Sequence, residues 1–231
     1  MGKGAPLRWL ENRILWRHLR GCGVEIGALW RQFPLPARAR VWYVDRLDSD
    51  GLLKQYPTLR GKILWPDLVA EAAQLPVAPA SLDFIIASHL LEHLPFPLAA
   101  LRAWYETLVP GGVLLLRVPD KRYTFDTQRA RTQLAQLIEE YNHPERFDRR
   151  AHYADWVQNV KDGNPETEAF EREVRRLMEM DFSIHFHVWI DEDLREIIDY
   201  TRQAWYFDWK PVVFWGAHFY RKEVVLLLRR A

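Results

Sequence analysis

The stretch SLDFIIAS at residues 81–88 decides the fold, because it is a mainly apolar run bounded by polar residues. Such a run is typical of a parallel strand that is buried on both faces of its sheet. Downstream, apolar residues recur at helical spacing at Leu98, Leu101, Tyr105 and Leu108. A Pro-Gly-Gly turn follows and ends the helix, so this part of the chain predicts a strand and a helix that crosses over the sheet.

The same alternation extends on both sides of this unit. Residues 24–28 and 41–44 are short apolar runs that predict two earlier strands, and residues 113–118 predict the next buried strand. Between them we expect a short helix over 51–59 and an extended segment over 62–65. Because strands alternate with helices, the sequence predicts a parallel sheet with right-handed crossovers.

A lead-in helix is expected before the sheet, over residues 7–19. Its apolar residues recur among basic ones at Leu7, Leu10, Ile14 and Trp16, which indicates an amphipathic helix.

The last part of the chain determines the rest of the architecture. Residues 210–215 and 223–228 are β-rich runs whose short connection suits a hairpin, so the final pair is antiparallel. Residues 126–190 carry helical apolar stripes and are too long for a loop, which indicates a helical cap insertion. We therefore predict one domain over 1–231, a doubly wound α/β fold with a mostly parallel, seven-stranded Rossmann-like sheet and an antiparallel last strand.

Composition and charge exclude several functional classes. The 32 basic and 31 acidic residues nearly balance, so no global field attracts nucleic acid or an anionic membrane. The sequence holds no apolar run of about twenty residues, which excludes a spanning helix. Cys22 is the only cysteine, which excludes an intrachain disulfide and a Cys-rich zinc site. A reducing cytoplasm is the expected location.

Polar residues follow the predicted strands, where open α/β sheets bind their ligands. Glu25 and Gly27 close the first strand, Asp45 ends the second, Asp67 follows the third and His89 the fourth. This pattern resembles that of the class I S-adenosylmethionine (SAM)-dependent methyltransferases. The resemblance implies that these five residues surround SAM as the cofactor, with Asp45 at the ribose hydroxyls and Asp67 at the adenine amine.

Three further segments bear on this resemblance. SHLLEHL at 88–94 and LVPGGVL at 108–114 are similar to the family's segments around its fourth and fifth strands. VPDKRYTFD at 118–126 resembles a subgroup that is associated with bacterial surface glycans. Because these residues follow the fifth predicted strand and include a cation and a phenol, we expect Arg122 and Tyr123 to contact the acceptor.

The cofactor loop departs from the family pattern, because Leu29 and Arg31 stand where glycines are usual. Side chains there imply a wider loop. One alternative is therefore a methyltransferase-like binding module without turnover. A nicotinamide-dependent oxidoreductase is a further alternative, but its pyrophosphate needs a glycine-rich backbone.

Two histidines are candidate bases. His185 and His187 alternate with apolar Phe186 and Val188, so in an extended segment both imidazoles face the cleft. Imidazole titrates near neutral pH, so either could remove a proton from a hydroxyl acceptor, with Asp120 orienting the ring.

No metal is expected from the sequence. His89 and His93 lie four residues apart, but no third ligand is evident near them. The eleven tryptophans suit stacking against sugar faces. The sequence therefore predicts O- or N-methylation of a small-molecule or glycan-like acceptor by SAM, and it leaves the oligomeric state open.

Overall fold

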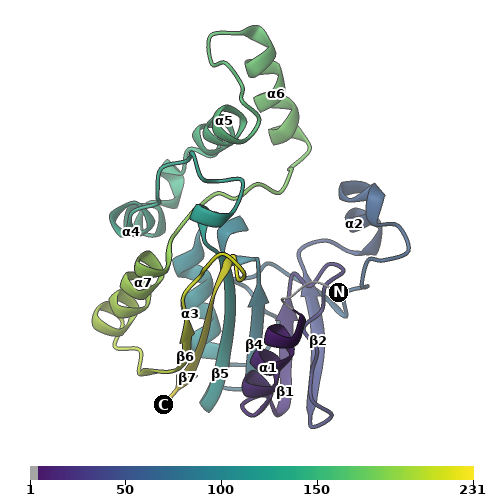
Figure 1. Ribbon diagram of the computed structural model, residues 1–231, viewed down its shortest axis with the longest axis vertical. Coiled ribbons are helices and arrows are strands. Elements are labelled where there is room, and N and C mark those ends of the chain that lie inside the picture. The colour runs from purple at the N-terminus through teal and green to yellow at the C-terminus, as the bar shows by residue number, and fades with distance from the viewer. Residues whose placement is uncertain (1–4) are drawn as a thin grey trace.

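The computed structural model describes residues 5–231 and shows a twisted sheet with helices on both faces (Figure 1). The sheet contains seven strands in the order β3-β2-β1-β4-β5-β7-β6. The strands are β1 (Gly21–Ile26), β2 (Ala39–Asp45), β3 (Leu68–Val69), β4 (Leu82–Ser88), β5 (Leu108–Pro119), β6 (Trp209–Trp215) and β7 (Glu223–Arg230). The neighbours from β3 to β5 pair in parallel, whereas β7 is antiparallel to both β5 and β6. The predicted fold class is thus confirmed.

The described chain also contains seven α-helices. They are α1 (Ala5–Trp16), α2 (Ser49–Gln55), α3 (Pro97–Thr107), α4 (Leu134–Asn142), α5 (Arg149–Val160), α6 (Glu168–Glu179) and α7 (Asp191–Ala204). Short 3-10 turns are η1 (Pro57–Leu59), η2 (Leu91–His93), η3 (Lys121–Tyr123) and η4 (Pro144–Arg146). Within residues 5–231, no helix combines the length and the apolar character that a membrane crossing needs.

The central strands are buried on both faces because alternate residues enter different cores. On one face Ile85 and Leu114 pack with Leu101 of α3 and with residues of α7. On the other face Phe84 and Leu115 pack with residues at the end of α1. This two-sided burial explains why Phe84 to Ala87 of β4 are apolar without interruption.

The structure corrects the predicted apolar side of the first helix. Leu10 and Ile14 are 53% and 39% exposed, whereas Leu15 and Leu19 are fully buried against the sheet. The apolar spacing shows that a helix forms, but contact with the sheet decides which side is covered.

The expected extended segment at 62–65 is also corrected, because the third strand is the two-residue β3 further along the chain. The backbone amide of Leu64 donates a hydrogen bond to the carbonyl of Leu29, and Leu64 pairs with none of the strands described. Trp65 is 71% exposed. The third strand therefore ends at Val69, two residues beyond Asp67.

The residues between β5 and α7 form three helices at the carboxyl end of the sheet (Figure 1). Helices α5 and α6 enclose a separate apolar cluster around Tyr153, Val174 and Leu177. The returning segment, residues 182–190, leads from this cluster to the edge of the sheet. It forms no regular strand and touches the site described next.

Candidate functional site

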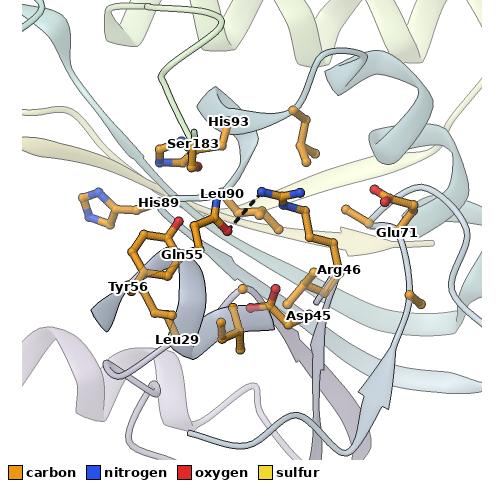
Figure 2. A pocket seen from close by; sticks show the side chains of 16 residues that line it. Leu29, Asp45, Arg46, Gln55, Tyr56, Glu71, His89, Leu90, His93 and Ser183 are labelled. Carbon is orange, nitrogen blue, oxygen red and sulfur yellow. Dashed lines mark hydrogen bonds between the residues drawn. The ribbon is translucent and has the colours of Figure 1, made fainter. Parts of the chain in front are cut away.

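A cavity lies at the carboxyl ends of β1, β2 and β4, and Figure 2 shows the side chains around it. Its volume is about 290 Å³, close to the lower end of the range of small-molecule sites. We call it the first cavity. Its lining includes Gly27, Leu29, Asp45, Arg46, Leu52, Gln55, Tyr56, Glu71, Ala72, His89, Leu90, His93, Leu94 and Ser183.

The backbone around the first cavity has positive φ at three positions, one glycine and two strained non-glycine residues. Gly27, directly after β1, has a φ of +70°, and a Cβ atom there would lie 3.0 Å from Leu90 Cδ1. Leu29 and His89 also have positive φ values, of +49° and +52°, which side chains rarely adopt. Such strain collects at ligand sites, where the surrounding structure holds it in place.

Two carboxylates lie at one side of the first cavity. Asp45 ends β2, and burial raises the pKa of its carboxyl. Glu71 follows β3 by two residues and adds negative charge close to Asp45. The sequence did not single out Glu71, because the third strand was expected to end earlier.

Another part of the first cavity's lining is held together by bonds between segments that lie far apart in the chain. Arg46 binds Asp181, and its guanidinium donates to Gln55 Oε1 at 3.1 Å. Gln55 in turn donates to the carbonyl of Asp181 at 2.8 Å. Because Asp181 lies beyond α6 and Gln55 on α2, these bonds close the cavity between the sheet and the helical region. Ser183, from the same returning segment, lines the cavity.

Two of the residues expected to contact the cofactor lie outside this lining. The carboxylate of Asp67 accepts from the amide of Tyr43 at 2.8 Å, so it supports the β2–β3 pair. Glu25 is fully buried and accepts from the amide of Phe33 at 2.8 Å, which holds the loop after β1 against the strand. Burial raises the pKa of Glu25 to about 7.

A second cavity adjoins the first, and His89 lines both. Its lining is aromatic and charged: Glu11, Arg31, His89, Pro119, Tyr123, Thr124, Phe125, His185, Tyr220, Arg221, Lys222 and Glu223. The imidazole Nε2 of His89 lies 2.6 Å from Glu223 Oε2, which raises the pKa of His89 above its usual value despite burial. His89 thus stands between a cavity of carboxylates and apolar groups and one of aromatic and basic groups.

The loop at Leu29 and Arg31 is accommodated without blocking the first cavity. Residues 27–38 run as turns and loop, where a helix would otherwise follow β1. Leu29 lines the first cavity, while Arg31 stacks over the ring of Trp30 at 4.1 Å and lines the second.

Of the residues expected around the acceptor, Tyr123 lines the second cavity, whereas Asp120 and Arg122 form an ion pair beside it. Asp120 is fully buried and accepts from Arg122 Nη2 at 2.6 Å. Arg122 also binds Asp191 at 2.5 Å, which links the end of β5 to α7. Arg122 thus bridges two carboxylates beside the cavity, which gives it a structural role there.

The two candidate histidines have different surroundings. His185 lines the second cavity, and its Nδ1 lies 2.7 Å from Asp126 Oδ2. His187 is fully buried, stacks on Trp189 and lies 3.2 Å from the carbonyl of Pro95. Burial lowers the pKa of His187 to about 4.

The expectation that both histidines face the cleft is therefore corrected. Residues 182–188 are not a strand, so side chains do not alternate between core and cleft. Phe186 and Val188 are buried as expected, but so is His187.

Comparisons with solved structures show the same fold at low sequence identity. A protein from Rhodobacter sphaeroides, named for Zn-dependent alcohol dehydrogenases, is 18% identical with a TM-score of 0.58, over 96% of this chain and 90% of that one. A SAM-dependent methyltransferase from Methanosarcina mazei is 14% identical with a TM-score of 0.50, and the match covers 94% of this chain and 96% of that one. The PH0226 protein from Pyrococcus horikoshii is 14% identical with a TM-score of 0.51, and the match covers 98% of this chain and 90% of that one.

No curated protein matches the chain. The family model described as "Methyltransferase domain" does match, over residues 8–160, which cover β1 to β5. The chain therefore belongs to the methyltransferase domain family, and it is an enzyme with SAM as its cofactor.

Proposed function

We propose that the enzyme methylates an oxygen or nitrogen atom of a small-molecule or glycan-like acceptor that binds in the second cavity. The observation that carries this proposal is the shared wall at His89, because a donor in the first cavity and an acceptor in the second would meet there. SAM, when bound, supplies an electrophilic methyl group. The chain's own task is mainly to hold the acceptor atom in line with that group.

The first cavity has the features that SAM requires. Asp45 offers a carboxylate to the ribose hydroxyls, and Gly27 lets the backbone approach the ligand closely. Leu52, Leu90 and Leu94 supply apolar surface for the adenine ring. Glu71, in place of Asp67, is the acidic group beyond β3 that this arrangement would use.

The second cavity favours a polar acceptor with apolar faces. Phe125 and Tyr220 are 55% and 72% exposed at its edge, where their rings could cover the faces of a sugar. Arg31 and Glu223 add charged partners for hydroxyl or acidic groups. This mixture supports a glycan-like acceptor better than an apolar one.

The proposal is tested by measuring release of demethylated cofactor with a panel of sugars and small hydroxylated or aminated compounds. With an acceptor found, Phe125→Ala should raise the KM for that acceptor while the Kd for SAM stays constant. Phe219→Ala is the matched control, because Phe219 is 75% exposed nearby but lies outside the cavity lining. An unchanged acceptor KM in Phe125→Ala would place the acceptor elsewhere.

A further inference from the structure

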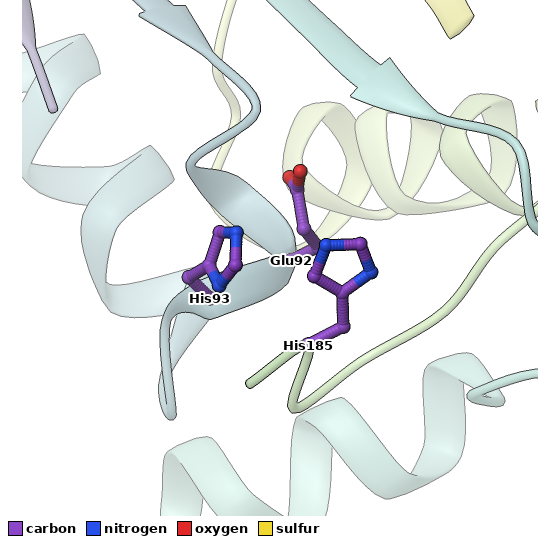
Figure 3. Close-up of side chains that lie close together, drawn as sticks. All are labelled: Glu92, His93 and His185. Carbon is purple, nitrogen blue, oxygen red and sulfur yellow. The ribbon is translucent and has the colours of Figure 1, made fainter. Parts of the chain in front are cut away.

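Three potential ligand side chains meet between the two cavities. Glu92 and His93 lie on η2, directly after β4, and His185 lies on the segment that returns from α6. One ligand atom from each lies within 4.8 Å of the others. Figure 3 shows the two imidazoles beside the Glu92 side chain. Each ring has one nitrogen on the side that faces the Glu92 carboxylate.

Both imidazoles are oriented by a partner at Nδ1. His93 Nδ1 lies 2.8 Å from the carbonyl oxygen of Ile184, which only accepts, so this nitrogen carries the proton. His185 Nδ1 donates in the same way to Asp126, whose other oxygen accepts from Arg129 at 2.9 Å. Both Nε2 atoms therefore present lone pairs. Metal-binding histidines are typically held by such carbonyl or carboxylate partners.

Glu92 completes the set. Its side chain is 1% exposed, and neither carboxylate oxygen accepts a hydrogen bond from any residue of the described chain. Its nearest recorded ion-pair partner is His89, at 3.8 Å. A buried carboxylate without hydrogen bonds is costly, and a bound cation would remove that cost.

The backbone fixes the three side chains relative to each other. The carbonyl of Glu92 accepts from the amides of Phe186 and His187, at 2.8 and 3.2 Å. These bonds join η2 to the returning segment, so Glu92 and His185 are held together although they lie far apart in the sequence.

We propose that Glu92, His93 and His185 bind one divalent transition-metal ion. Two imidazoles and one carboxylate are the donors of zinc and non-haem iron sites that keep open positions. Nitrogen donors disfavour Mg²⁺, which prefers oxygen. His185 is then a ligand, in place of the base that the sequence indicated.

An ion at this position would face both cavities, since His93 lines the first and His185 the second. Its open positions can take an oxygen of the acceptor and lower the pKa of a bound hydroxyl. This role rests on the proposed function, whereas binding of the ion does not.

Metal binding is measured on the full chain after chelator treatment and dialysis, without SAM or acceptor. Calorimetry with Zn²⁺ should show one ion per chain, and Co²⁺ should give visible absorption bands, while Mg²⁺ at equal concentration should not bind. Asp126→Asn should weaken Zn²⁺ binding by about 10- to 100-fold. His185→Ala should weaken it further, and His143→Ala, at a half-exposed histidine outside the cluster, is the control.

Glu92→Gln keeps the size of the side chain and removes the buried charge. Without metal, this variant should have a Tm equal to or above that of the wild type, while Zn²⁺ should no longer raise it. Absence of a one-to-one site in the wild type, or a site that persists in both Glu92→Gln and His185→Ala, would overturn the proposal. Methyl transfer at the same rate with and without the ion would refute its role toward the acceptor alone.

Discussion

Glu25 provides a direct test of the electrostatics behind the cofactor loop. Its carboxyl is fully buried in β1, and burial raises its pKa from 4.5 to about 7. The folded state therefore holds the proton more tightly than the unfolded state does. The contribution of Glu25 to stability is therefore fully present below about pH 4.5 and is lost as the pH rises through about 7.

The magnitude follows from the pKa. Each pKa unit corresponds to about 1.4 kcal/mol, so the rise from 4.5 to about 7 costs the folded protein about 3 kcal/mol once Glu25 ionises. Glu25→Gln keeps an oxygen that can accept from the Phe33 amide but cannot ionise. The variant should therefore gain about 2–3 kcal/mol relative to the wild type between pH 5 and pH 8.

Urea unfolding, followed by tryptophan fluorescence at a series of pH values, measures this difference. Other buried carboxyls, such as Asp45, contribute equally to both proteins and cancel. Glu166→Gln at an exposed position is the control, and its difference from the wild type should not change with pH. A constant difference for Glu25→Gln across the range would refute the reasoning.

Two further predictions concern SAM binding, with calorimetry as the measurement. Asp45→Ala should weaken SAM binding by about 1.5–3 kcal/mol through loss of a charge-assisted hydrogen bond, whereas Asp67→Ala should leave the SAM affinity unchanged because that carboxylate binds Tyr43. Gly27→Ala should cost about 1–2 kcal/mol of stability, because residue 27 has positive φ, and it should also weaken SAM binding. Gly111→Ala is the control. Gly111 has a φ of +84° with open space around it, so this variant should lose stability but keep its SAM affinity. Equal SAM affinities for both glycine variants would mean that the backbone at Gly27 does not approach the cofactor.

The fold could be predicted because its central strands are buried on both faces. The apolar run of β4 predicts a strand by itself, without knowledge of which other strands it pairs with. The two-residue β3 has too few residues to show a pattern, and the apolar residues at 62–65 gave a stronger local signal. The sequence therefore placed the end of the third strand before Asp67, whereas the structure places it before Glu71, and only Glu71 lines the first cavity.

The site could be predicted only where residues directly follow strands. Gly27, Asp45 and His89 line the first cavity because parallel strands end at the same edge of the sheet. Arg46 and Gln55 depend on Asp181, which no local pattern places near them. The burial of His187 depends in the same way on packing against Trp189 and Pro95.

The returning segment, residues 182–190, contributes side chains to both cavities. Ser183 lines the first cavity and His185 the second, and the segment is tied to η2 through the carbonyl of Glu92. At its far end, Lys121 donates from its amide to the carbonyl of Trp189, which fixes it to the end of β5. Most of the first cavity's lining thus comes from the sheet edge, whereas the helical region determines where Ser183 and His185 stand. Changes in α5 or α6 that shift this segment should therefore alter both the Kd for SAM, measured by calorimetry, and the KM for the acceptor.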